Sequence, residues 1–349
     1  MPSRVTVNLF ESHAPASRLS VEGPFHIARP DIHVPSGKYI FEADGGIIHL
    51  RNVGKTHAYS VDSQLFILDS TNGIRMQYST SQTRKYGGVV RVARDEKILR
   101  VTNVIPTFDY VQSVVGSEGF SGYPLESAKA QAVLTMTRVY KSRPNEVVGD
   151  STQEESYFGM DYCSPLTKQA VTEVWGQWLT YKQQPIQIFY HSTCAGGTSD
   201  GARVFGSGAS NMPYLHCVPC KYCAASMFWK PIVKLIPRKN FEKEFGDLPT
   251  VDQTDCADRP VALTLHKNGK RIDESGYQFW MKLGQKFGWD KAPGLRFKLR
   301  AKGDNVEVES TGAGHGVGMC QWGAAGMAKQ GKTYDQILRY YFPGTTLQR

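Results

Sequence analysis

Cysteines with the spacing of metal ligands stand close to a histidine in the middle of the chain. Cys217, Cys220 and Cys223 are each three residues apart, the spacing that lets neighbouring thiolates chelate one ion. Cys194, three residues after His191, could fold back to complete a tetrahedron. Four cysteine ligands leave no open position for a catalytic water, so the pattern predicts a structural zinc site.

Other uses of these sulfurs stay open from the sequence. In an exported protein the same cysteines could form one or two disulfides, and His191 could replace Cys217, whose spacing is the least standard. A zinc hydrolase would need mixed ligands and an open position, which so many sulfurs argue against. The seven cysteines are an odd number, and Cys163, Cys256 and Cys320 have no assigned role.

Glu118 is the carboxyl group best placed for acid–base chemistry. The pattern TFDYVQSVVGSE predicts a helix capped by Thr107 that ends at this residue. The negative end of the helix dipole, with Phe120 and Tyr123 nearby, would raise the pKa of Glu118 and suit it as a general acid for glycosidic cleavage. The alternative is a surface glutamate at a frayed helix end. Glu126 has a simpler explanation, because a carboxylate in a first helical turn is stabilising.

A glycine-rich stretch near the C-terminus lets the backbone approach another group closely. In TGAGHGVGMCQWGAAG, glycines alternate around His315 before a helix begins near Gln321. A phosphate-binding loop is disfavoured because no Lys followed by Ser or Thr closes it. Two interpretations remain: a tight turn with His315 hydrogen-bonded in the core, and a cleft wall that hydrogen-bonds a sugar.

The spacing of apolar residues changes after Pro106. Residues 4–103 alternate like strands punctuated by DGG, TNG and DEK turns, which predicts a β-rich N-terminal domain over residues 1–105. Residues 106–349 are expected to form the catalytic domain. Helices are expected over 107–118, 121–142, 167–178, 275–289 and 333–344, and strand hairpins over 178–192 and 295–311. The second hairpin strand of 178–192 would deliver His191 to its end. The fold class is therefore α+β, with a core of helices and antiparallel hairpins beside the N-terminal β domain.

Composition excludes some classes of protein. The chain is 40% hydrophobic and 21% charged, as globular domains are. Its net charge of +9 is scattered, so no basic block predicts nucleic-acid binding, while a diffuse positive field favours polyanions such as an acidic glycan. No apolar run approaches the ~18 residues of a membrane span. Strand-like alternation from Arg4 suggests that an export leader has been removed before a mature domain.

Three stretches together resemble the stage II sporulation protein D (SpoIID/LytB domain) family. The first is YVQSVVGSEGFSGYPLESAKAQAVLTMTRVY, which is similar to the family's glutamate helix and ALKAQAVAARTY helix. The second is FYHSTCAGGTSDGARVFGSGASNMPYLHCVPCKYC, similar to its HSTxGGxT and VPxxY elements, and the third is GAGHGVGMCQWGAAGMAKQGKTYDQILRYYFPGT, similar to its GHGVGMSQYGA signature. The resemblance spans most of residues 106–345, with the motifs in the family's order.

The resemblance implies a peptidoglycan lytic transglycosylase. Such an enzyme cuts the glycosidic bond after N-acetylmuramic acid in glycan strands that an amidase has stripped of stem peptides, and leaves a 1,6-anhydro sugar. Glu118 would be the single acid/base, and the chemistry would need no metal. An exported protein of the cell envelope, periplasm or cell wall, is implied. The residues expected to contact the substrate are Tyr190, His191, Ser192, His315, Gly316 and Gln321.

The chain departs from the family pattern in places that do not touch Glu118. Cys320 stands where serine is usual, and Gly119 replaces a hydrophobic residue. The segment DYCSPLTKQA lacks a cysteine and histidine cluster found in some relatives, which argues against Cys163 as a ligand. A rival interpretation is a non-catalytic wall-binding module or amidase enhancer.

Overall fold

The computed structural model describes residues 1–28, 31–53, 58–61, 65–79, 81–119, 122–143, 146–151, 154–209 and 211–349. The chain divides into two compact units, Met1–Trp178 and Leu179–Arg349. The domain boundary expected between residues 105 and 106 lies inside the first unit, where strand β10 (Ile98–Pro106) ends and helix α1 (Thr107–Glu118) begins. The division into domains 1–105 and 106–349 stays a prediction. In the described part of the chain, no helix is long and apolar enough to cross a membrane.

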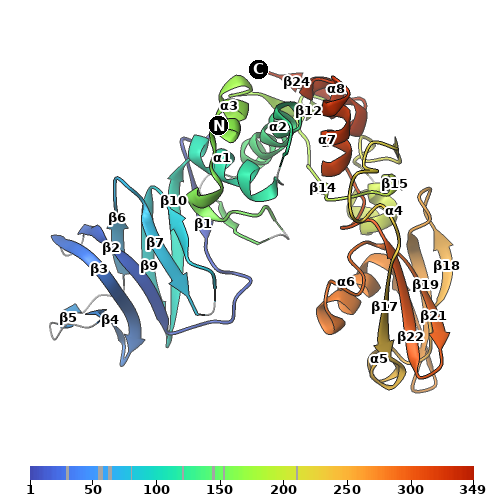
Figure 1. Ribbon diagram of the computed structural model, residues 1–349, viewed down its shortest axis with the longest axis horizontal. Coiled ribbons are helices and arrows are strands. Elements are labelled where there is room, and N and C mark those ends of the chain that lie inside the picture. Colours follow the sequence, from blue (N-terminus) through green and yellow to red (C-terminus); the bar gives the residue numbers. More distant parts are fainter. Residues whose placement is uncertain are drawn as a thin grey trace. The chain divides into compact units, whose positions relative to one another are not determined.

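The first unit is built on one large sheet (Figure 1). Among the described residues it contains eleven strands, in the order β11-β1-β10-β9-β6-β2-β3-β4-β5, with β7 pairing to β2 and β8. The strands are β1 (Arg4–Asn8), β2 (Arg18–Ala28), β3 (Asp31–Asp44), β4 (Ile47–Asn52), β5 (Ala58–Val61), β6 (Leu65–Asp69), β7 (Ile74–Tyr78), β8 (Arg84–Tyr86), β9 (Val89–Asp95), β10 (Ile98–Pro106) and β11 (Val147–Gly149).

Alternation of apolar and polar residues forms this sheet, as the sequence predicts. Along β10, Leu99, Val101 and Ile105 are buried while Arg100 is exposed. This period of two places one face of each strand in the core.

Helices follow directly at the end of β10. They are α1 (Thr107–Glu118), α2 (Leu125–Lys141), the short 3-10 helix η1 (Gly159–Tyr162) and α3 (Pro165–Glu173). The cap of α1 is Pro106 rather than Thr107, whose hydroxyl instead donates to the carbonyl of Pro2 over 2.6 Å. Glu126 lies in the first turn of α2, as expected, and pairs with Lys129.

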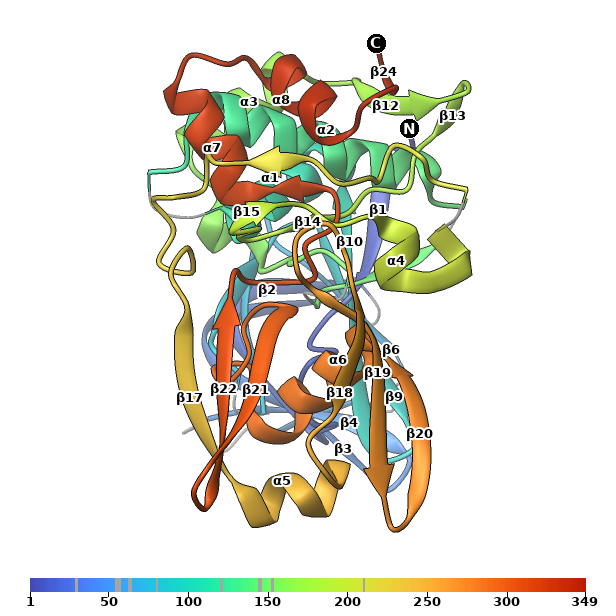
Figure 2. The same ribbon diagram turned by 90° about the vertical axis from the view of Figure 1, so that its right-hand side faces the viewer.

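The second unit combines small sheets with short helices (Figure 2). Its strands are β12 (Trp178–Tyr181), which begins at the last residue of the first unit, β13 (Gln184–Pro185), β14 (Tyr190–His191), β15 (Gly196–Gly197), β16 (Pro219–Cys220), β17 (Ile232–Pro237), β18 (Thr250–Thr254), β19 (Pro260–Lys267), β20 (Lys270–Ser275), β21 (Arg296–Lys302), β22 (Asn305–Thr311), β23 (Met319–Cys320) and β24 (Thr346–Gln348). Its helices are α4 (Gly201–Phe205), η2 (Gly206–Ala209), α5 (Arg238–Phe245), α6 (Gly276–Phe287), α7 (Gln321–Lys329) and α8 (Tyr334–Tyr341).

The pairings confirm most expected elements of this unit. The hairpin of β21 and β22 and the helices α6 and α8 fall where they were expected. Strand β17, which joins β22, and the antiparallel sheet β18-β19-β20 were not predicted. The expected hairpin over 178–192 was wrong in its second half: β13 ends at Pro185, and His191 lies in β14, which pairs in parallel with β23. Helices and mostly antiparallel sheets together confirm the α+β class.

Candidate functional site

Glu118 is the last residue of α1, as the sequence predicts. Its side chain is half-buried, and Oε1 accepts a hydrogen bond from the backbone N–H of Ser156 over 2.6 Å. Tyr123 is buried, while Phe120 lies outside the described residues. The carboxylate is therefore oriented by a main-chain donor at the end of a helix, with part of its surface open to solvent.

The donor belongs to residues 155–159, which we call the clamp segment and which the sequence analysis missed. The N–H of Phe158 donates to the hydroxyl of Ser117 over 3.1 Å. The hydroxyl of Ser113 donates to the carbonyl of Gly159 over 2.6 Å. The clamp segment is thus fastened along the C-terminal half of α1 by contacts that include the one to Glu118.

In the second unit, a two-residue parallel pairing joins the two expected substrate motifs. Tyr190 and His191 of β14 lie opposite Met319 and Cys320 of β23. The N–H of Trp322 donates to the carbonyl of Ser192 over 3.1 Å. The structure therefore brings Tyr190, His191 and Ser192 together with His315, Gly316 and Gln321, whereas Glu118 belongs to the first unit.

The two histidines of these motifs share one partner. The ring N–H at Nδ1 of His191 donates to the carbonyl of Val317 over 3.1 Å, and the N–H of Val317 donates to Nδ1 of His315 over 3.0 Å. Burial, then His315 and Arg259, lower the pKa of His191 well below its usual range. Burial and the charge of Arg259 lower the pKa of His315 to about 4. Both rings are neutral near pH 7, and no described residue hydrogen-bonds Nε2 of His191.

Arg259 is a buried cation that the sequence analysis did not identify. It packs against the glycine-rich loop at Gly316. It is 1% exposed, and its guanidinium donates to the carbonyls of Cys194 and Gly197 over 2.7 and 3.0 Å. It also donates to the hydroxyl of Ser199 over 3.1 Å. A Cβ on Gly316 would lie 2.4 Å from its Nε, and Gly316 has φ +84°. Only glycine lets the loop rest on this side chain.

Four buried cysteines form a sulfur cluster, and they are not quite the four expected. Sγ atoms of Cys194, Cys220, Cys223 and Cys320 all lie within 4.8 Å of one another, and each residue is 0% exposed. Cys194 follows β14, Cys220 ends β16, and Cys320 ends β23. The cluster thus ties together the segments around β14 and β23, which contain the expected substrate residues.

The expected assignment of Cys217 to this cluster was wrong. Its sulfur forms a disulfide with Cys256, so it is not available as a thiolate ligand. Cys320, 97 positions after Cys223, takes the fourth place. His191 is not in the cluster, and Cys163 is a free, half-buried thiol of the first unit.

The surroundings of the cluster fit a tetrahedral metal ion. Zn–S bonds of about 2.3 Å place neighbouring sulfurs about 3.8 Å apart, and Sγ of Cys194 and Cys223 are 3.5 Å apart. Backbone N–H groups of Cys194 and Gly323 each donate to Sγ of Cys320 over 3.3 Å, and the hydroxyl of Tyr341 lies 3.1 Å from Sγ of Cys220. Such donors stabilise thiolates, as does the N-terminus of α7 at Cys320.

Helix α7 packs closely on the backbone at Tyr222, between Cys220 and Cys223, and this packing predicts whether a substitution at Gly326 stabilises or destabilises the protein. A Cβ on Gly326 would lie 2.0 Å from the carbonyl oxygen of Tyr222. In an open helix, Gly→Ala would stabilise by about 1 kcal/mol, but this backbone contact reverses the sign. We expect Gly326→Ala to lower the free energy of unfolding by about 1–3 kcal/mol in urea denaturation. Lys329→Ala, exposed on the same helix, is the control; a stabilised Gly326→Ala protein would contradict the packing.

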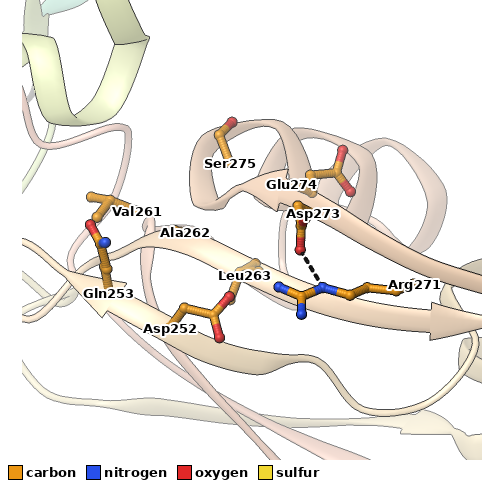
Figure 3. Close-up of a pocket in the computed structure, with 9 residues that line it drawn as sticks. All are labelled: Asp252, Gln253, Val261, Ala262, Leu263, Arg271, Asp273, Glu274 and Ser275. Carbon is orange, nitrogen blue, oxygen red and sulfur yellow. Dashed lines mark hydrogen bonds and ion pairs between the residues drawn. The ribbon is translucent and has the colours of Figure 1, made fainter.

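A surface pocket elsewhere in the second unit contains none of the expected site residues. It lies on the β18-β19-β20 sheet (Figure 3) and is lined by Asp252, Gln253, Val261, Ala262, Leu263, Arg271, Asp273, Glu274 and Ser275. Nε of Arg271 donates to Asp273 over 2.9 Å. The pocket's polar side chains are in part already paired with each other.

Comparison with known proteins shows which family the chain resembles. A family model described as stage II sporulation protein matches residues 95–181, which include Glu118 and the clamp segment. The stage II sporulation proteins D of Bacillus subtilis (strain 168) and Bacillus amyloliquefaciens are each 29% identical, over 264 and 275 residues that cover 70% of this chain and 74% of each relative. A shorter match, 50% identical over 40 residues, covers 12% of this chain and 6% of the amidase enhancer of Bacillus subtilis.

These matches agree with the three motifs that carry the resemblance in the sequence. The two longer matches must include residues of both compact units, because they cover 70% of the chain and each unit contains only about half of it. Residues 95–181 match the stage II sporulation protein family model, and over about 70% of its length the chain is similar to stage II sporulation proteins D.

Proposed function

We propose that the protein is a lytic transglycosylase that cleaves the bond between N-acetylmuramic acid and N-acetylglucosamine in peptidoglycan strands lacking stem peptides. The similarity to stage II sporulation proteins suggests a protein related to sporulation or the cell wall. The observation that carries the finer proposal is the setting of Glu118, a half-buried carboxylate at a helix end within the matched residues, oriented by the N–H of Ser156.

One carboxyl group is enough for this reaction. Glu118 gives its proton to the glycosidic oxygen as the bond from that oxygen to C1 of the muramic acid breaks. The resulting carboxylate takes the proton of the C6 hydroxyl of the same sugar, whose oxygen bonds to C1. The products are a 1,6-anhydro end and a free hydroxyl end, Glu118 is protonated again, and no water is consumed.

Substrate contacts are proposed for the paired motifs of the second unit. Neutral imidazoles at His191 and His315 offer hydrogen bonds without charge, which suits sugar hydroxyl and acetamido groups. The half-buried side chains of Tyr190 and Ser192 lie on the same strand segment. With Gly316 and Gln321 they make up the proposed binding set, and residues 106–349 the proposed catalytic part of the chain.

A structural zinc ion is the proposed occupant of the sulfur cluster. Cys194, Cys220, Cys223 and Cys320 would hold it, and it would supply rigidity rather than chemistry because four thiolates fill a tetrahedral site. The protein would act in the cell envelope after export, following an amidase that removes the stem peptides.

Products of digestion test the proposal directly. Peptidoglycan treated with an amidase is incubated with the full chain, and the soluble products are analysed by mass spectrometry. We expect 1,6-anhydromuramic ends, lighter by one water than hydrolytic products. Untreated peptidoglycan is the matched control and should release much less. Hydrated reducing ends, or no soluble product, would contradict the proposal.

A non-catalytic wall-binding protein is the alternative. The 40-residue match to a protein named amidase enhancer is the observation in its favour. In that case the chain would sediment with denuded peptidoglycan and raise the rate of an added amidase, while releasing no glycan by itself.

A further inference from the structure

Glu155, at the start of the clamp segment, is a carboxyl group that the proposed reaction does not use. It is 0% exposed, although the next residue, Ser156, donates its N–H to Glu118. Carboxylates are almost never fully buried unless they are paired, so this position needs a physical reason.

Both carboxyl oxygens of Glu155 are held by the helices of the first unit. The hydroxyl of Thr135, from α2, donates to Oε1 over 2.9 Å. The hydroxyl of Tyr110, from α1, donates to Oε2 over 3.4 Å, and Nε of Arg138 lies 3.9 Å from the same oxygen. Arg138 also pairs with Glu154, so its charge is shared. Glu155 therefore anchors the clamp segment to both α1 and α2, which Figure 1 shows side by side.

The charge of this anchor depends on pH near neutrality. Burial raises the pKa of Glu155 to about 7, and the charge of Glu118 contributes in the same direction. Arg138, Thr135 and Tyr110 oppose the rise. The two carboxyl groups therefore influence each other electrostatically within one unit of the protein.

We propose that Glu155 is the positioning residue for Glu118: its buried carboxyl fixes the backbone that orients Glu118, and its ionisation acts on that carboxylate. Consecutive Cα atoms are about 3.8 Å apart along a stiff backbone, so a shift of Glu155 moves the Ser156 N–H with it. The contacts above give the backbone link from Glu155 to Glu118, and the charge of Glu118 acts on the pKa of Glu155. Only the effect on catalysis rests on the proposed function.

A measurement independent of activity tests the coupling. Because the pKa of Glu155 is raised from its ordinary 4.5 to about 7, the folded protein keeps a proton that the unfolded chain releases between those values. The stability due to Glu155 is full below pH 4.5, is lost as the pH rises toward 7, and stays lost above it. Melting temperatures of the full chain are compared from pH 4 to pH 9 for wild type, Glu118→Gln, Glu155→Gln and the double variant.

We expect wild type to lose stability relative to Glu155→Gln across this window and to stop losing it near pH 7. In the Glu118→Gln background, the same difference should level off at lower pH because one negative charge is gone. Glu146→Gln, an exposed glutamate of the same unit, is the control and should follow wild type. If the two difference curves superimpose, the coupling is absent and the proposal is overturned.

Kinetics on denuded glycan test the positioning role. Glu155→Ala should lower kcat per folded molecule by about 10–100-fold with little change in KM, because misplacing an acid by about 1 Å costs up to that much. Glu155→Gln, which keeps the shape, should restore kcat to within about threefold at pH 6 and lose an inflection of the pH profile near 7. An unchanged kcat per folded molecule in Glu155→Ala would overturn the proposal. If wild type cleaves nothing, the proposed function fails, while the melting series still decides the coupling.

Discussion

Glu118→Gln is expected to reduce release of anhydro products from denuded peptidoglycan by about 10²–10⁴-fold, the range over which a general acid–base group acts. Glutamine has the shape of glutamate, and its amide oxygen can still accept the N–H of Ser156. What it lacks is a proton to give to the leaving oxygen and a charge with which to take one back. The measurement is the initial rate of product release, followed by mass spectrometry at equal protein concentration.

The matched control for this variant is Glu126→Gln. Glu126 lies in the first turn of α2, where it pairs with Lys129 over 2.6 Å and where a neutral side chain costs only a little stability. We expect its rate to stay within about twofold of wild type, since surface changes of this kind are usually worth less than about 0.5 kcal/mol. Equal rates for wild type and Glu118→Gln would show that Glu118 is not the acid.

The second large effect is expected at the sulfur cluster. Cys320→Ser should abolish stoichiometric zinc binding and unfold much of the second unit, because a structural zinc site contributes an apparent binding free energy of about 10–16 kcal/mol to folding. The same loss is expected when wild type is treated with a strong chelator. Zinc content by elemental analysis and the melting curve of the full chain are the two readouts.

Cys217→Ser separates a metal site from a set of disulfides. Cys217 is paired with Cys256 and lies outside the cluster, so this variant should keep about one zinc per chain. The opposite outcome is wild-type protein that contains no zinc and whose cluster cysteines do not react with thiol reagents. That result would establish disulfides at Cys194, Cys220, Cys223 and Cys320.

Local patterns were sufficient to predict the helix that presents Glu118. The period of apolar residues after Pro106 and the glycine at position 119 mark both ends of α1, and the structure places them there within one residue. The alternating strands of the first unit were predicted for the same reason. Pro24 interrupts the pattern of β2, where a proline argues against a central strand, yet the strand forms across it.

Contacts between segments far apart in the sequence could not be read in this way. The spacing of three residues favoured Cys217 as a ligand, yet the parallel pairing of β14 with β23 brings Cys320 to the cluster instead. Arg259 and Glu155 carry no local signal of burial, because a charged residue in a polar segment is usually exposed. Only the tertiary structure shows that their charges are enclosed and their hydrogen bonds made.

The positions of the four cluster cysteines in the sequence determine when the second unit can complete its folding. Cys194 leaves the ribosome well before Cys320, and the cluster cannot close until Cys320 has been added. The first unit, whose residues precede Leu179, can fold on its own schedule during this interval, as N-terminal domains generally do. Until Cys320 has been added, β14 lacks its partner strand β23 and the cluster lacks its fourth cysteine. A nascent chain of this length would therefore contain a folded helix α1 with Glu118 and an incompletely folded second unit.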